Sequence, residues 1–245
     1  MTPVLVGLGV LTLAAALAFE FRAAGLAALF FFAAFLLEAK STGVLASPFQ
    51  VGMLFATALV GFGRVYAKRP RLKALVRLLY AAALFVALVS FHYRGRVAEG
   101  LSAWATLIHS GSFAVAYALL TVAYLAVVLE FLQHRALKKR PWLALRRPPL
   151  LVLLGLELPY LRYGYLAYTL GLFTGMAWAF RVFGSPISWD PKEVLTLVAW
   201  SLFTLRLLLP RGVDPGVKLL IWTLAYLAMA AAFFAAPLLG GRHPV

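Results

Sequence analysis

The sequence contains no cysteine and only eight acidic residues among 245. Without cysteine the chain cannot form a disulfide, exchange thiols, or attach haem covalently to itself through a Cys-x-x-Cys-His motif. Charged residues make up 13% of the chain, hydrophobic residues make up 64%, and the mean hydropathy is +0.92. A soluble domain of this length needs a more polar surface, so the composition indicates an integral membrane protein.

Long apolar segments recur along the whole chain. They approach or reach the roughly 20 residues that cross a bilayer as a helix, and alternating ten-residue strands are absent. The sequence therefore predicts an all-α, polytopic transmembrane bundle of about eight spans. The spans are expected at residues 3–20, 23–39, 44–66, 74–91, 103–132, 161–182, 194–209 and 217–238. The first two are short enough to form one re-entrant hairpin, and the first lacks the basic n-region of a signal peptide.

The 23 basic residues give the chain a net charge of +15, but they are divided unevenly between the two ends of the spans. When alternate loops are grouped, seventeen fall on one side and six on the other. The positive-inside rule makes the first side cytoplasmic, so both termini and the segment 183–194 are expected to be extracytoplasmic. Basic loops gathered at one membrane face argue against nucleic acid as a partner, and binding of anionic lipid is compatible with this orientation.

No polar stretch is long enough for a second domain, so residues 1–245 are expected to form a single integral membrane domain. The longest polar segment, QHRALKKRPWLALRRPP at residues 133–149, is basic and ends in two prolines. It is expected to be a cytoplasmic connector that lies partly on the membrane interface.

Three charged residues gather in one short segment, FGSPISWDPKEV at residues 183–194, between two apolar runs. Asp190 precedes Pro191 at the expected start of a helix, and Glu193 follows three residues later. This spacing is typical of a helix N-terminus, where Asp190 caps the first turn and Glu193 is the reciprocal partner. A structural role is therefore one interpretation of the segment.

Aromatic residues accompany this segment and support a second interpretation. Trp178, Phe183 and Trp189 are compatible with an interfacial aromatic belt. They are also compatible with an aromatic shelf for a ligand, whose carboxylate Lys192 or Arg181 could meet. The residues alone leave both interpretations open.

Three of the four histidines, His92, His109 and His243, are expected at the outer ends of spans, whereas His134 is expected on the cytoplasmic side. Neutral imidazole ligates metals, so two histidines that converge at the outer end could supply both axial ligands of a haem iron. The alternative is a set of interfacial histidines that are hydrogen-bonded to water or lipid headgroups.

The stretch GYLAYTLGLFTGMAWAFRVFGSPISWDPKEVLTLVAWSLF, residues 164–203, resembles the tryptophan-rich signature of the CcsA/CcmC family of cytochrome c assembly proteins. The Trp-Asp-Pro-Lys-Glu end of that signature is matched at residues 189–193. The other matching positions are Gly164, Gly171, Gly175, Trp178 and Trp200. The resemblance is to the CcsA branch in particular, and it covers residues 101–245. Residues 1–100 match only as additional N-terminal transmembrane helices.

Two histidines extend this resemblance. His109 is followed eight residues later by Tyr117, and His243 follows the turn APLLGGR, as in the CcsA branch. The resemblance implies that His109 and His243 are the axial ligands of a non-covalently bound haem b at the outer face. It also implies a binding surface against the porphyrin, made of Trp178, Phe183, Trp189, Asp190 and Lys192.

The chain departs from the family pattern at two places. Phe183, Pro186 and Ile187 stand where the family usually has more tryptophans. Many CcsA proteins also carry a histidine in the span after the loop, and here Arg206 and Leu208 lie near that position. A haem path through the bundle that uses such a histidine is therefore not expected.

The resemblance implies a cytochrome c biogenesis protein of the bacterial inner (plasma) membrane that presents haem to apocytochrome c together with a CcsB-like subunit. It leaves open whether the chain is itself catalytic within such a haem lyase complex. The alternative is a HemX-like regulator or scaffold of tetrapyrrole biosynthesis without stoichiometric haem. A transporter is less favoured, because Glu38, Glu130 and Glu157 are expected near span ends rather than at mid-membrane.

Overall fold

The computed structural model describes residues 1–18, 23–93, 103–139, 142, 147–210 and 212–234. Within these residues the chain forms α-helices, one 3-10 turn and no strand. The helices are α1 (Thr2–Ala18), α2 (Ala24–Thr42), α3 (Pro48–Ala67), α4 (Lys73–Phe91), α5 (Ala103–Lys139), α7 (Leu150–Phe183), α8 (Pro191–Leu208) and α9 (Pro215–Phe234), with the 3-10 turn η1 (Pro70–Leu72) before α4. These eight helices correspond one to one, in order, with the eight expected spans.

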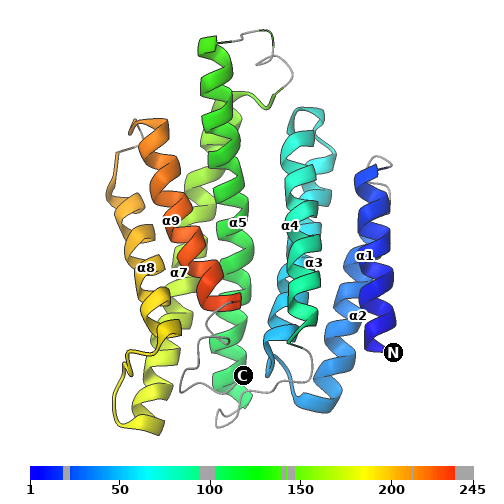
Figure 1. Cartoon of the computed structure of the whole chain (residues 1–245), viewed down its shortest axis with the longest axis vertical. Coiled ribbons are helices and arrows are strands. Elements are labelled where there is room, and N and C mark those ends of the chain that lie inside the picture. The colour runs from blue at the N-terminus through cyan, green and yellow to red at the C-terminus, as the bar shows by residue number, and fades with distance from the viewer. Residues whose placement is uncertain (19–22, 94–102, 140–141, 143–146, 211, 235–245) are drawn as a thin grey trace.

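The helices run roughly along one common axis and form two groups (Figure 1). Helices α1 to α4 pack on one another in chain order on one side, and α5, α7, α8 and α9 form the other side. Within the second group α5 packs along α7, and α8 packs along α9. The two groups meet mainly where α3 lies against α5. Consecutive helices are therefore neighbours, as short connections require.

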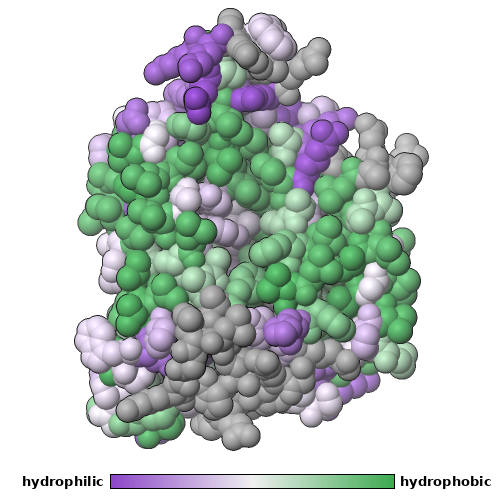
Figure 2. Space-filling model, viewed as in Figure 1, coloured by the Kyte–Doolittle hydropathy of each residue, from purple (hydrophilic) through white to green (hydrophobic). Residues whose placement is uncertain are grey.

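Six of these helices are long and apolar enough to cross a membrane: α2, α3, α4 with its preceding turn, α5, α7 and α9. Helix α1 is apolar but shorter, and α8 carries Lys192, Glu193 and Arg206 within 18 residues. Figure 2 shows a broad green apolar surface around the middle of the bundle, with purple polar residues concentrated toward the ends. The expected class, a helical membrane bundle with several spans, is confirmed.

Two helices are longer than the expected spans. Helix α5 continues to Lys139 instead of ending near residue 132, so the first part of the expected connector 133–149 is helical. This part contains Ala, Leu, Arg and Lys, which favour helix even outside the membrane. Helix α7 begins at Leu150, eleven residues before the expected start, and it contains Pro159. The largely apolar residues 150–160, which lie outside the expected spans, therefore belong to α7.

Candidate functional site

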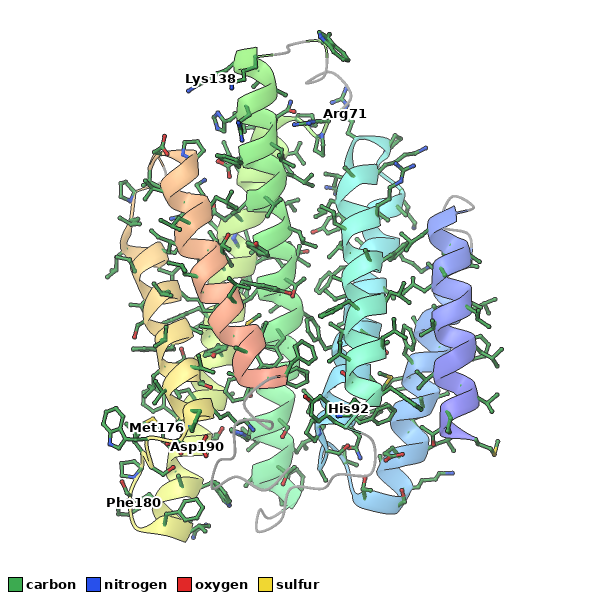
Figure 3. The ribbon with its side chains drawn as sticks, in the orientation of Figure 1. Arg71, His92, Lys138, Met176, Phe180 and Asp190 are labelled. Atoms are coloured by element: carbon green, nitrogen blue, oxygen red, sulfur yellow. The ribbon has the colours of Figure 1, made fainter. Side chains whose placement is uncertain are left out.

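One end of the bundle holds most of the described residues that the sequence selected for function. Figure 3 shows Asp190, Phe180, Met176 and His92 at this end, whereas Lys138 lies at the opposite end. The segregation of basic loops from the WDPKE segment, inferred from the sequence, agrees with this arrangement. We call the first end the loop end and the second the basic end. His243 lies outside the described residues.

His109 lies on α5 and faces α7. Its Nδ1 is 2.9 Å from the carbonyl oxygen of Gly171, and its ring meets the ring of Phe113 edge to face at 5.1 Å. A carbonyl oxygen can only accept a hydrogen bond, so Nδ1 carries the proton in this contact. The lone pair of the neutral imidazole then resides on Nε2, the nitrogen that could ligate a metal. The contact thus sets the tautomer that the predicted ligand role requires.

Two glycines of α7 make room for this histidine. A Cβ atom at Gly175 would stand 2.7 Å from Cε1 of His109, and a Cβ atom at Gly171 would stand 3.0 Å from the ring of Phe113. Both distances are too short for packing without displacement of the rings. The spacing of the two glycines, four residues apart, places both on one face of the helix. Their match to the family signature therefore has a steric reason, namely the close approach of α5 and α7.

The segment between α7 and α8 has left-handed backbone at both ends, relaxed at a glycine and strained at a tryptophan. Gly184 ends α7 with a φ of +73°, and its amide donates to the carbonyl of Phe180 at 3.0 Å. Trp189 has a φ of +58°, a conformation that large side chains rarely adopt. Its indole is 74% exposed. Backbone strain combined with an exposed aromatic ring is typical of a binding surface.

Asp190 caps α8, as the sequence predicts. Its Oδ1 accepts from the amide of Lys192 at 2.8 Å, and Pro191 occupies the first turn. Glu193 also accepts a backbone hydrogen bond, but from the amide of Ser188 at 2.7 Å rather than from Asp190. The reciprocal contact therefore braces the preceding loop. The buried Oδ2 of Asp190 has no hydrogen-bond partner among the described residues.

The aromatic residues do not form one closed pocket around the loop. Trp178 and Phe183 meet edge to face at 5.5 Å, whereas Trp189 points to the exterior. The side chain of Lys192 is exposed. Trp104, at the start of α5, is 76% exposed and was not selected from the sequence because it stands outside the signature. The loop end thus presents an aromatic surface that is open to a ligand or a partner.

A column of aromatic rings runs from His109 into the centre of the bundle. Phe113, which contacts His109, meets Tyr168 edge to face at 5.0 Å. Tyr168 lies 5.9 Å from Phe203, and Phe203 lies 5.5 Å from Trp222. These contacts join α5, α7, α8 and α9, so the position of His109 depends on packing that extends toward the basic end.

The column ends at a cluster of buried charges. Lys218 donates to both carboxylate oxygens of Glu130, at 2.8 and 2.9 Å, and to Oε2 of Glu157 at 3.1 Å. Nε of Arg206 donates to Oε1 of Glu157 at 2.7 Å, and Trp222 donates to the same oxygen at 2.9 Å. The two acidic and two basic side chains cancel in charge, which lowers the cost of burying them in an apolar bundle.

Sequence reasoning missed this charge cluster. It grouped Arg206 and Lys218 with the cytoplasmic ends of their spans and expected Glu157 near a span end, whereas each of the three is 1% exposed and lies inside a helix of the bundle. A signal was present, because each charge interrupts an apolar helical run. The pairing could not be inferred, since the partners are 49 to 88 residues apart.

The described residues contain no group of three or more His, Asp or Glu side chains that could hold a metal ion by themselves. A haem requires fewer protein donors, because the porphyrin supplies four nitrogens and the protein supplies the axial ligands. The Nε2 lone pair of His109 fits one axial position. The exposed aromatic surface of the loop end fits the apolar faces of a macrocycle.

Comparison with known proteins gives both a match along the chain and shorter local matches. The model of the family described as cytochrome C assembly protein matches residues 5–238. The cytochrome c biogenesis protein CcsA of Aethionema cordifolium is 30% identical over 86 residues, which cover 33% of this chain and 25% of the relative. The CcsA protein of Synechococcus sp. (strain CC9902) is 34% identical over 83 residues, which cover 33% and 27%.

A third relative named CcsA, from Cycas taitungensis, is 43% identical over 44 residues, or 18% of this chain and 14% of the relative. These alignments therefore span about a quarter of the relatives' length or less. The family model reaches much further and includes the N-terminal helices, for which the motifs gave no resemblance. Since it covers nearly all of a multi-pass helical bundle that carries the WDPKE segment, the chain belongs to the cytochrome c assembly protein family.

Proposed function

We propose that the chain is a CcsA-like subunit that binds haem b at the loop end of the bundle and presents it to apocytochrome c. His109 and His243 serve as the axial ligands of the non-covalently bound haem. Trp178, Phe183 and Trp189 lie against the macrocycle. In this proposal residues 101–245 form the haem-handling region, and residues 1–100 add helices that support it within the same domain.

The observation that carries this proposal is the hydrogen bond from Nδ1 of His109 to the carbonyl oxygen of Gly171. An axial histidine in proteins usually donates its second ring N–H to a carbonyl or carboxylate, which orients the ring and increases the basicity of the ligating nitrogen. His109 makes this kind of hydrogen bond within the protein itself. Gly175 leaves the space that the ring occupies.

The loop supplies the second part of the proposal. Asp190 and Glu193 hold the loop onto the start of α8, so Trp189 is presented from a braced backbone. Lys192, at the start of α8, brings a cation to this loop, and its amine would meet a propionate of the haem because the two groups carry opposite charge. Asp190 thus acts in the proposal as a positioning residue for the loop.

A partner is required for the covalent step. Attachment joins the vinyl groups of ferrous haem to cysteine thiols, and this chain has no cysteine. The thiols therefore come from apocytochrome c, and this chain contributes orientation and exclusion of stray reactions at the iron. We propose a CcsB-like subunit as the partner that docks the apocytochrome, within a haem lyase complex of a bacterial inner membrane.

Absorption spectra of the purified protein test the ligands. In mild detergent, with the co-expressed partner, the wild-type chain is expected to show a sharp reduced α-band with about one low-spin haem per chain. His109→Ala and His243→Ala should each abolish this signal, because one imidazole alone cannot give bis-histidine ligation. Retention of the low-spin signal in both single variants would contradict the proposed ligand pair.

His92→Ala is the matched control. His92 is exposed and lies at the same end of the bundle as Asp190 (Figure 3), but it caps the end of α4, outside the region proposed to handle haem. The control should keep the full haem signal. Loss of haem in His92→Ala together with its retention in His243→Ala would indicate that His92, and not His243, is the second axial ligand.

A second candidate function is a HemX-like regulator or scaffold of tetrapyrrole biosynthesis. The observation that favours it is the open loop, in which Pro186 and Ile187 replace tryptophans and Trp189 is largely exposed. This function predicts no stoichiometric haem. It also predicts normal cytochrome c maturation in cells that carry His109→Ala, whereas the first function predicts loss of maturation.

A further inference from the structure

A cavity opens between the two helix groups, away from the loop end and the charge cluster. It has a volume of about 230 Å³ and is lined by residues of α3, α4, α5 and α9. Its walls include Phe55, Tyr117, Tyr124, Tyr226 and Phe233. Figure 2 shows pale, weakly polar residues in a recess in the middle of the green apolar surface. The cavity therefore lies at the height of the membrane spans.

The cavity is open toward the surroundings of the bundle. Phe85, one of its lining residues, is 59% exposed and stands in the middle of the apolar helix α4. Around such a helix the surroundings are the hydrocarbon core of the bilayer. A molecule can therefore enter the cavity sideways from the lipid phase.

The hydroxyl groups in the cavity wall are largely engaged with protein. The hydroxyls of Thr121 and Tyr226 are 2.9 Å apart, and Thr121 also donates to the carbonyl of Tyr117 at 2.6 Å. The hydroxyl of Tyr124 lies 3.4 Å from that of Thr223. None of the described residues that line the cavity is charged. The walls thus favour an apolar ligand over a polar one.

The size and chemistry of the cavity distinguish between ligand classes. A cavity of about 150 Å³ with apolar walls stays dry and binds small apolar molecules, and the predominantly apolar described walls here favour hydrocarbon over water in the same way. A haem would bring two propionates, for which the described lining residues offer no cation. A ligand with carbonyl groups would need hydrogen-bond donors; the hydroxyls of Thr121, Tyr124 and Tyr226 already have partners, which leaves Tyr117 as the remaining hydroxyl among the described lining residues.

We propose that this cavity is a binding site for the acyl chain of a membrane phospholipid. The chain fills the space between α4 on one side and α5 with α9 on the other, and it completes the packing of the two helix groups. Tyr117 links the site to the loop end, because its ring stacks on Phe113 at 5.6 Å and Phe113 contacts His109. Lipid occupancy therefore supports the wall of aromatic side chains behind His109.

Photo-crosslinking in vesicles tests the site. The full-length protein is reconstituted in phosphatidylethanolamine and phosphatidylglycerol vesicles that contain phosphatidylglycerol with a diazirine within its acyl chain. Mass spectrometry is expected to locate crosslinks on peptides of α4, α5 and α9 that line the cavity. Ala82→Phe should abolish these crosslinks, because Ala82 lines the cavity and the larger ring fills it.

Ala81→Phe is the matched control. Ala81 is the exposed neighbour on the same helix, so its substitution should leave the cavity crosslinks intact. Equal crosslinking of the cavity peptides in both variants would overturn the proposal. If Ala82→Phe does not fold, Ala230→Phe fills the cavity from the opposite wall on α9 and takes its place.

Two further outcomes are decisive. Displacement of the label by an isoprenoid alcohol, but not by an excess of phospholipid, would assign the cavity to isoprenoid chains and overturn the acyl-chain proposal. Crosslinking of His109→Ala is measured in parallel with its haem content. Since the lipid site does not depend on iron ligation, crosslinks should persist in that variant, and failure of one proposal would leave the other standing.

Discussion

The two ends of the α5–α9 helix group handle polar side chains in opposite ways. Toward the basic end, Glu157 and Lys218 are buried and exchange short hydrogen bonds with charged partners. At the loop end, by contrast, Trp189 and Lys192 are exposed. Toward the basic end these side chains bond to one another inside the bundle, whereas at the loop end they face outward.

This difference separates groups that hold the bundle from groups that meet a ligand. A buried charge network with matched partners selects one packing of the helices, because every alternative leaves a charge unpaired. An exposed aromatic surface on strained backbone contributes little to packing. We therefore expect substitutions in the charge cluster to act on folding, and substitutions of the exposed aromatic side chains at the loop end to act on haem.

The largest expected effect is on stability, in Lys218→Met. Removal of this amine leaves Glu157 paired with Arg206, and leaves Glu130 with only the imidazole of His134, 3.8 Å away, so the buried carboxylate of Glu130 loses its permanent counter-charge. Breaking a buried ion pair in this way costs about 3–5 kcal/mol. Thermal unfolding of the protein in detergent measures the change. Lys192→Met, at the exposed start of α8, is the control and should unfold near the wild-type temperature.

Gly175→Ala should have the next largest effect, and it should lower both stability and haem content. The new methyl group meets the imidazole of His109, and overpacking of this kind costs about 1–3 kcal/mol. We expect a lowered haem content in a protein that still folds. Gly155→Ala on the same helix has open space around it and should leave both haem and stability unharmed. Equal haem loss in both variants would remove the steric argument.

Asp190→Ala should have the smallest effect. Loss of the cap at the start of α8 costs about 1 kcal/mol. Asp190→Asn keeps an acceptor for the amide of Lys192 and should restore most of this stability. Haem content per folded chain should change little, as measured by the reduced α-band. Complete loss of haem in both variants would place Asp190 in contact with the haem rather than in a supporting position.

Local features of the fold were predictable from the sequence, and distant contacts were not. Apolar runs gave the order of the eight helices, and the sequence around Asp190 gave the cap. The tautomer of His109 depends on Gly171, which is 62 residues away, so no local pattern reports it. The charge cluster likewise requires knowledge that Glu130 and Lys218 converge. Apolar periodicity also could not place the ends of α5 and α7, because good helix formers continue beyond the spans.

Helix α7 is longer than a bilayer-spanning helix needs to be. Its 34 residues extend for about 51 Å, well beyond the roughly 30 Å of bilayer hydrocarbon. At the loop end α7 projects past its neighbours (Figure 1). Phe180 and Phe183 lie in the last turn of α7, at this projecting end. These two rings could therefore be contacted by a water-soluble protein that binds the loop end.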